Sequence, residues 1–140
     1  MKRTRLAKKG KSETAKIKRK LDIEFSRMIR ERDKGMPCIA LCGRKGEHQA
    51  GHFRRRELMA TRWHPKNVNG QNTYCNSWDN DGFRHAKGID ERWGSGTAEE
   101  LEKLSRSVKQ WTPRELEILI QATKKGHKTY LIAYDRLSTV

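Results

Sequence analysis

The stretch that decides the fold is GEHQAGHFRRRELMATRWHPKNVNGQNTYCN, residues 46–76, in which histidines and asparagines surround arginines and a late cysteine. Its His-Pro and Asn-Gly pairs favour turns and divide it into pieces too brief for long helices. Two of these pieces, residues 49–53 and 68–71, are predicted to form short strands. Helical patterns lie on both sides of the stretch, so the chain is predicted to have an α+β fold.

Before this stretch, apolar residues recur at helical spacing from about Ser12 onward. They are Ile17, Leu21, Phe25, Met28 and Ile29. Gly35 and Pro37 follow as stop signals. The pattern therefore predicts an amphipathic helix that ends near Lys34.

The last third of the chain is predicted to be helical. The apolar face of its first helix, which ends at Gly94, consists of Phe83, Ala86, Ile89 and Trp93. Thr97 with Glu100, and Thr112 with Glu115, indicate two capping boxes at the starts of further helices. Three apolar residues of the last of these are expected to face inward, namely Leu116, Leu119 and Ile120. The segment TYLIAYDRL, residues 129–137, fits either a strand or a short helix.

The composition is strongly basic: the 140 residues include 32 Lys and Arg against 17 Asp and Glu, a formal net charge of +15. The excess is clustered and not mixed evenly with acids, which favours a polyanionic partner such as DNA or RNA. Residues 1–11 are expected to form a flexible basic arm that gains order on a phosphate backbone. Its nucleic-acid contacts are expected from Lys2, Arg3, Arg5, Lys8 and Lys9.

The sequence contains no apolar stretch long enough to cross a membrane, and no basic helix with a bulky apolar face that would lie in lipid. Three cysteines without an apolar signal segment favour a reducing compartment, so we expect a cytoplasmic protein. We divide the chain into the basic arm (1–11), an N-terminal helix (12–36), a central core (37–94) and a C-terminal helical region (95–140). The C-terminal region is expected to brace the core or to form a homodimer interface.

Short sequence blocks follow one another in a specific order: MIRERDKGMPCIALCG, QAGHF, LMATRWHPKNV, YCN and RWGSGTAEELEKLS. In this order they resemble the phage NinG/Rap recombination-nuclease family over most of the chain, from about residue 25 to residue 125. The resemblance implies a small ββα-metal core of the HNH type and, for a phage-encoded protein, a place in the host cytoplasm. It also implies a metal-dependent, structure-selective DNA endonuclease that acts on branched recombination intermediates such as Holliday junctions or D-loops.

Phosphodiester hydrolysis needs a base that activates water, a metal that neutralises charge on the phosphate, and cations that hold the backbone. The resemblance places His52 as the general base and Asn76 as a ligand of Mg²⁺ or Mn²⁺. Asn67 occupies the middle motif, whose asparagine holds the loop between the strands and orients the base. The cations that would bind phosphate are Arg54, Arg55 and Arg56.

Each of these residues also has an ordinary explanation. His52 could be a histidine without chemistry, Asn76 could cap the following helix, and Asn67 could be a turn residue. At least one of the three arginines could be solvated surface charge. The cysteines and asparagines that accompany His52 in order favour the catalytic interpretation.

The cysteine pattern departs from the two pairs expected for structural zinc in the family. Cys38 and Cys42 have one residue more between them than a CxxC pair, and Asn72 stands where the second pair would begin. Cys75 is then the third thiolate, whereas zinc takes four ligands. We therefore expect either a zinc site completed by His48 or another group, or cysteines that only pack.

Gly51 precedes His52, where many HNH sites have an aspartate that binds the metal. The second Mg²⁺ ligand is therefore not assigned, and its candidates are His48, Glu57, Asp79 and Asp81. These departures leave two other functions open. One is a non-catalytic basic DNA-binding module with a decayed HNH site, and the other is an RNA-binding structural protein.

Overall fold

The structure of the protein is a computed structural model that describes residues 12–44, 48–78 and 81–138. The elements in these residues are α1 (Glu13–Arg32), β1 (His48–His52), β2 (Val68–Asn72), α2 (Thr73–Ser77), α3 (Gly82–Trp93), α4 (Thr97–Ser105), α5 (Pro113–Lys125) and α6 (His127–Ser138). This mixture of helices and a small sheet confirms the predicted α+β class. The predicted basic arm, with Lys2, Arg3, Arg5, Lys8 and Lys9, lies outside the described residues. Among the helices described, none has the length and apolar character needed to span a membrane.

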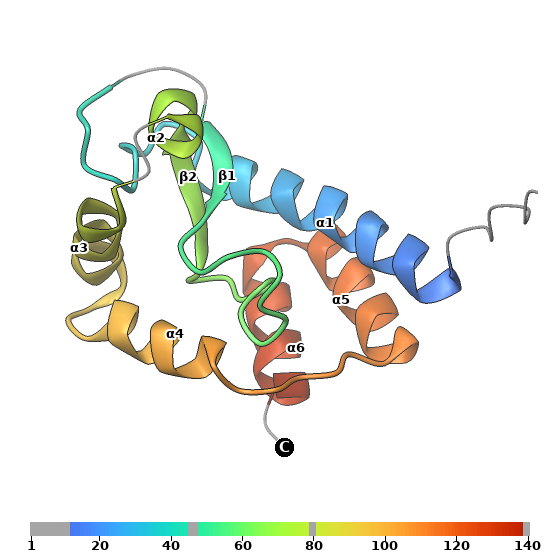
Figure 1. Ribbon diagram of the computed structural model, residues 1–140. Coiled ribbons are helices and arrows are strands. Elements are labelled where there is room, and N and C mark those ends of the chain that lie inside the picture. The colour runs from blue at the N-terminus through green and yellow to red at the C-terminus, as the bar shows by residue number, and fades with distance from the viewer. Residues whose placement is uncertain (1–11, 45–47, 79–80, 139–140) are drawn as a thin grey trace, which may run out of the picture.

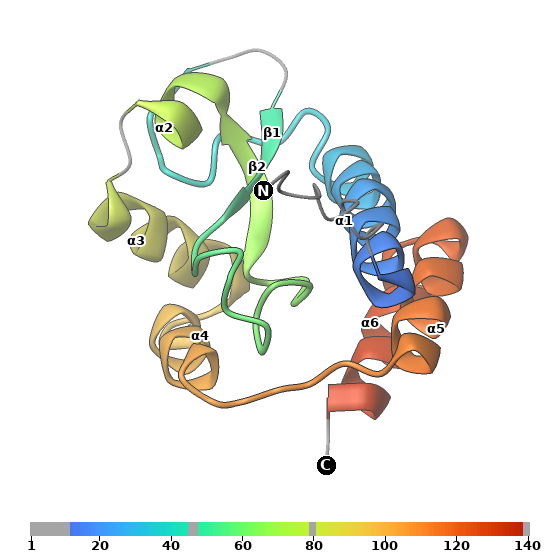
Figure 2. The same cartoon turned by 45° about the vertical axis from the view of Figure 1, so that its right-hand side comes forward.

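The two strands form a hairpin that lies between two groups of helices, as Figure 1 and Figure 2 show. β1 and β2 pair antiparallel, with His48 opposite Asn72 and His52 opposite Val68. Both strands are confirmed to within one residue of their predicted bounds. α1, α5 and α6 pack together on one side of the hairpin, α3 and α4 lie on the other, and α2 follows β2 directly.

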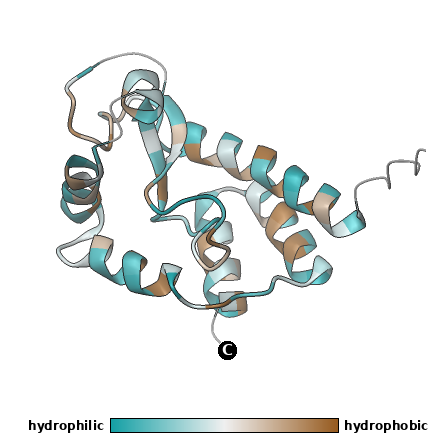
Figure 3. Ribbon diagram, viewed as in Figure 1, coloured by the Kyte–Doolittle hydropathy of each residue, from teal (hydrophilic) through white to brown (hydrophobic). Residues whose placement is uncertain are grey.

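Helix α1 is confirmed, and its buried face makes the main core with α5 and α6. The Ser12 hydroxyl caps it by accepting a hydrogen bond from the Ala15 N–H at 3.2 Å. The capping box of Thr112 and Glu115 is also present, at the start of α5. Figure 3 marks hydrophobic residues on α1 and α5. The core formed by these helices includes Leu21, Phe25, Met28, Ile29, Leu116, Leu119, Ile120 and Tyr130.

The segment from residue 129 onward belongs to helix α6, whose aromatic residues fasten the loop between the strands. The Tyr130 hydroxyl donates to the Trp63 carbonyl at 2.6 Å, and the Tyr134 hydroxyl donates to the Ala60 carbonyl at 3.1 Å. Both tyrosines and Trp63 are buried, where hydrogen bonds between protein groups must replace those with water. The C-terminal region thus braces the part of the chain that connects β1 to β2.

The capping box predicted at Thr97 is wrong. The N-cap of α4 is Gly96, in the left-handed region with a φ of 90°, and it makes no side-chain cap bond. The Thr97 hydroxyl instead donates to the Gly94 carbonyl at 2.7 Å. The cap comes from the preceding helix, because the Asp90 carboxylate accepts the Ala98 N–H at 2.8 Å.

The predicted apolar face of α3 is confirmed for Ile89, Ala86 and Trp93, which pack in one core cluster, but not for Phe83. Phe83, expected on the apolar face, is 78 % exposed, whereas His85 and Gly88 are buried. A Cβ atom at Gly88 would collide with the backbone carbonyl of Ile39. This close approach of α3 to the segment before β1 fixes the rotation of the helix, which turns Phe83 outward.

A buried carboxylate ties α1, the hairpin and α3 together. Asp33 is 4 % exposed, and it accepts hydrogen bonds from Arg32 Nε at 2.7 Å, Arg92 Nη1 at 3.1 Å and the Gly70 N–H at 2.7 Å. Burial alone would raise the pKa of Asp33, but the hydrogen bonds and charges of these donors outweigh burial and hold the pKa below its ordinary value of 3.8. The same contacts end α1 at Arg32, slightly before the predicted end near Lys34.

Candidate functional site

A cleft of about 720 Å³ lies between α1, the end of β1 and the last turn of α2. Residues predicted from the sequence meet in it, although they come from separate segments of the chain. They are His52, Arg55, Arg56 and Asn76. The fold therefore brings four of the predicted site residues to one place.

His52 has one ring nitrogen fixed by the backbone. Its Nε2 lies 3.0 Å from the Arg62 carbonyl oxygen, which can only accept, so Nε2 carries the proton and Nδ1 keeps a lone pair. Burial lowers the pKa of His52 below its ordinary 6.5; the Arg62 carbonyl opposes this shift, and the charge of Arg56 adds to it. At neutral pH the imidazole is therefore neutral and able to accept a proton.

Asn67 is hydrogen-bonded to the backbone of the loop that connects β1 to β2. It is fully buried, and its amide oxygen accepts the Arg54 N–H at 2.8 Å. Its amide nitrogen donates to the carbonyls of Thr61 at 3.0 Å and Arg54 at 3.3 Å. Both polar atoms of the Asn67 side chain are therefore bonded to the backbone of the loop, which also contains Arg62. Asn67 thus orders the loop whose Arg62 carbonyl bonds His52, and it does not line the cleft.

Asn76 lies within α2 with its amide oriented by β1. Its Nδ2 donates to Gln49 Oε1 at 2.9 Å, which leaves the amide oxygen of Asn76 as an acceptor in the cleft. The alternative that Asn76 caps the next helix is wrong, because Asp81 caps α3 through the N–H groups of Phe83 and Arg84. Asn72 performs the same task for α2.

Hard cations such as Mg²⁺ take oxygen ligands from proteins. The Asn76 amide oxygen is such a ligand, and Mg²⁺ in proteins binds through few protein oxygens together with waters and substrate phosphates. Among the candidates for a second ligand, His48 bonds a backbone carbonyl outside the cleft, Asp81 caps α3 and Glu57 does not line the cleft. Asp79 lies outside the described residues.

The cations of the cleft come from two parts of the chain. They are Arg55 and Arg56 from the loop, and Arg19 and Arg30 from α1. Arg54 is different, because its Nε donates to the Ser105 hydroxyl at 3.0 Å on α4. Of the predicted arginine run, two members therefore reach the cleft while Arg54 joins the loop to α4.

Asp22 is a site residue that the sequence interpretation missed. From α1 it accepts hydrogen bonds from Arg56 Nη2 at 2.6 Å, Arg62 Nε at 3.1 Å and the Trp63 indole at 3.0 Å. Burial would raise the pKa of Asp22, but the hydrogen bonds from Arg62 and Arg56 outweigh it and lower the pKa below 3.8. Since the Arg62 carbonyl fixes His52, the ionised Asp22 helps to hold the base in place.

A family model described as Bacteriophage Lambda NinG protein matches residues 1–131. The chain belongs to the NinG family. The match spans every element up to α6, and NinG membership connects the chain with phage recombination. The chain matches none of the curated proteins and none of the solved structures with which it was compared.

Next to the cleft, this NinG-family chain has a group of three thiols that could hold a metal ion such as zinc. The sulfur atoms of Cys38, Cys42 and Cys75 all lie within 4.8 Å of one another. In the described parts of the chain no further His, Cys, Asp or Glu joins them. His48, the predicted fourth ligand, is not part of this group.

We expect protein purified without chelator to contain about one zinc ion per chain, bound by these thiolates. Cys42→Ser should bring the zinc content close to zero and lower the urea midpoint of unfolding, because metal binding adds directly to folding free energy. Metal analysis and urea denaturation measure both effects, with Ser77→Ala on α2 as control. Zinc-free wild-type protein with a normal unfolding curve would show instead that the cysteines only pack.

Proposed function

We propose that this NinG-family protein is a Mg²⁺-dependent endonuclease that hydrolyses the backbone of branched DNA. The observation that carries the proposal is the His52 imidazole, fixed at Nε2 in a cleft that also contains Asn76 and several arginines. A base, a ligand for a hard cation and cationic phosphate binders are the groups that phosphodiester hydrolysis requires.

In this mechanism His52 is the general base. The Arg62 carbonyl holds the proton on Nε2, so Nδ1 accepts a proton from the water that attacks phosphorus. A divalent cation bound at the Asn76 oxygen would neutralise developing charge on the scissile phosphate. Arg55 and Arg56 bind the non-bridging oxygens through their paired N–H groups and keep the phosphate in line with the base.

The proposed preference for branched DNA rests on charge, shape and family. The net charge of +15 and the guanidinium groups of the cleft supply affinity for phosphates, which carries no base-sequence information. Selectivity would then come from the shape and deformability of the DNA. The connection of the NinG family with phage recombination supports branched intermediates as the substrate.

Single-turnover assays on a four-way junction, and on a linear duplex of the same sequence, test this proposal. We expect the junction to be cut in Mg²⁺, to remain intact in EDTA, and to be cut faster than the duplex. Equal rates on both substrates would contradict the proposed selectivity. Tight junction binding without cutting in either Mg²⁺ or Mn²⁺ would contradict the proposed nuclease activity.

The cutting rate should depend on pH through His52. Because burial lowers the pKa of His52, its neutral form persists to more acidic pH than for an ordinary histidine of pKa about 6.5. We therefore expect the single-turnover rate to stay above half of its maximum at pH 6.5 and to fall below that pH. The measurement is a rate profile from pH 5 to 8 at saturating protein. If the rate reaches half of its maximum only above pH 6.5, His52 with a lowered pKa is not the base.

A non-catalytic DNA-binding module is the second candidate, and one observation favours it. At Gly51, where many HNH sites have a metal-binding aspartate, a Cβ atom would collide with the Gln71 side chain across the hairpin. The chain therefore uses this position for cross-strand packing and not for a carboxylate. The junction assay distinguishes the two candidates, since a binding module leaves the DNA uncut.

A further inference from the structure

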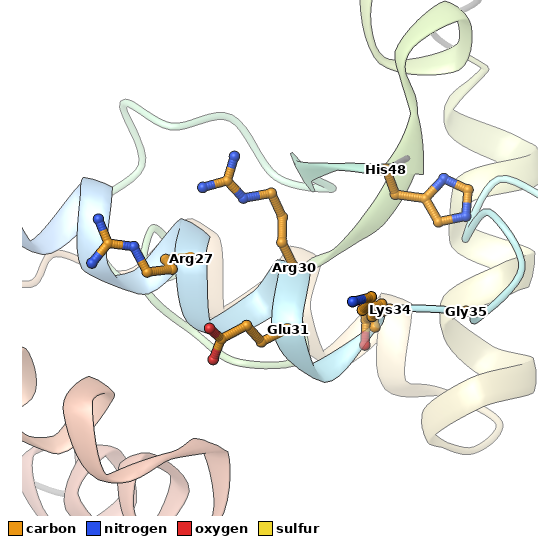
Figure 4. Close-up of a pocket in the computed structure, with 7 residues that line it drawn as sticks. Arg27, Arg30, Glu31, Lys34, Gly35 and His48 are labelled. Carbon is orange, nitrogen blue, oxygen red and sulfur yellow. The ribbon is translucent and has the colours of Figure 1, made fainter. Parts of the chain in front are cut away.

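A second cleft, of about 380 Å³, lies beside the first along α1. Figure 4 shows it between the C-terminal part of α1 and the start of β1. Its basic residues are Arg27, Arg30, Lys34 and His48. Arg30 also lines the catalytic cleft, so the two clefts adjoin at this side chain.

The second cleft is suited to an anion. Arg27 and Arg30 are exposed on α1, and the exposed Lys34 lies two residues beyond the end of the helix. Arg27 also pairs with Glu24 at 3.3 Å, whereas Arg30 and Lys34 are in no ion pair with another described residue. Of the two acids that line it, Asp33 is buried and already bonded by Arg32. The side chain of Glu31 points away from Arg30 and His48 (Figure 4). Positive charge therefore dominates the open part of the cleft.

His48 adds an unused ring atom to this cleft. Its Nε2 bonds the Met36 carbonyl at 2.8 Å, which orients the ring. Its Nδ1 is buried and has no hydrogen-bond partner among the described residues. Buried polar atoms without a partner are rare in proteins.

The two clefts are close enough for one DNA strand to pass both. His48 and His52 lie on the same face of β1, since alternate residues of a strand share a face. They are four residues apart, which at ~3.3 Å per residue is about 13 Å. A DNA strand that lies along β1 would therefore present phosphates to both clefts.

We infer that the second cleft binds a backbone phosphate of the strand being cut, on one side of the scissile phosphate. The inference rests on the proposed function, because it assigns the scissile phosphate to His52. It gives the site a direction: α1 runs from the His52 end of β1 to the His48 end, so the extra contact lies on one side of the cut. Lys34 and Arg27 are the residues specific to this contact.

The test uses four-way junctions in which one phosphate at a time is replaced by a neutral methylphosphonate. Affinities are measured in EDTA for wild-type protein, Lys34→Ala, Arg27→Ala and the control Lys128→Ala, an exposed lysine on α6. Losing one phosphate contact costs roughly eightfold in affinity at 0.1 M salt, from a slope of ~0.9 per contact. At one substituted phosphate we expect the wild-type affinity to fall by this factor of about eight. The same methylphosphonate should not weaken binding by Lys34→Ala, because that variant already lacks the contact.

Lys128→Ala should show the wild-type pattern at every position. The inference is overturned if each methylphosphonate costs the same in Lys34→Ala and Arg27→Ala as in wild type. It is also overturned if Lys34→Ala weakens binding to an RNA hairpin but not to the junction. Because binding in EDTA needs no cleavage, a protein that shows the coupling but never cuts would contradict only the proposed catalysis. A protein that cuts without the coupling would contradict only the second cleft.

Discussion

His52→Ala is expected to lower the single-turnover rate of junction cleavage by about 10²- to 10⁴-fold, which corresponds to roughly 3 to 5 kcal/mol of activation free energy. The reason is the loss of the group that accepts the proton from water. The removed imidazole is neutral at neutral pH, because burial lowers its pKa. Contacts with phosphate should therefore survive, and the junction affinity in a gel-shift assay should remain within about twofold of wild type.

Two further variants make this result specific. His52→Gln keeps an amide that can donate to the Arg62 carbonyl but cannot act as the base, so it should be as slow as His52→Ala. His127→Ala is the matched control, since His127 lines neither cleft. This variant should cut the junction at the wild-type rate. Cleavage by His52→Ala at the wild-type rate would rule out His52 as the base.

Asp33→Ala is expected to have the largest effect on stability, lowering the free energy of unfolding by about 3 to 5 kcal/mol. The substitution leaves Arg32 and Arg92 partly buried without their carboxylate, and it leaves the buried N–H of Gly70 without an acceptor. Urea denaturation at pH 7 measures the change. Glu99→Ala, which breaks an exposed ion pair with Lys103, should change stability by less than about 0.5 kcal/mol.

The pH dependence of stability gives an independent check on Asp33. Its pKa is lower in the folded protein than its ordinary value of 3.8, so the folded state binds fewer protons than the unfolded state below about pH 5. This contribution is fully present at neutral pH and is lost as the pH falls through 3.8 and below. Asp33→Ala should therefore lose less stability than wild type between pH 5 and pH 3. Identical losses in the two proteins would contradict the role assigned to this carboxylate.

The sequence was informative where local chemistry decides structure. Spacing of apolar residues predicted α1, and turn-forming pairs indicated the two short strands, because these signals act over a few residues. Motif order placed His52 and Asn76 on elements that do line one cleft. The fixed geometry of a hairpin followed by a short helix brings these two residues together.

The rest depends on packing between distant segments, which a pattern of a few residues cannot encode. Arg19, Asp22 and Arg30 share a face of α1 at helical spacing, but only the docking of α1 on the hairpin brings that face into the site. Likewise Arg54 is directed to α4 by the position of Ser105. The cap of α4 comes from a carboxylate of α3, so the local signal at its start was misleading.

The central claim is that the cleft holding His52 and Asn76 is a metal-dependent active site. The most direct test is the Mg²⁺ dependence of single-turnover junction cleavage by wild type, Asn76→Ala and His52→Ala. We predict that Asn76→Ala needs more Mg²⁺ than wild type and recovers part of its rate at high Mg²⁺, because its metal binding is weakened. His52→Ala should stay slow at every concentration, because no cation replaces the proton acceptor. The same Mg²⁺ dependence and the same rate in wild type and Asn76→Ala would contradict the claim.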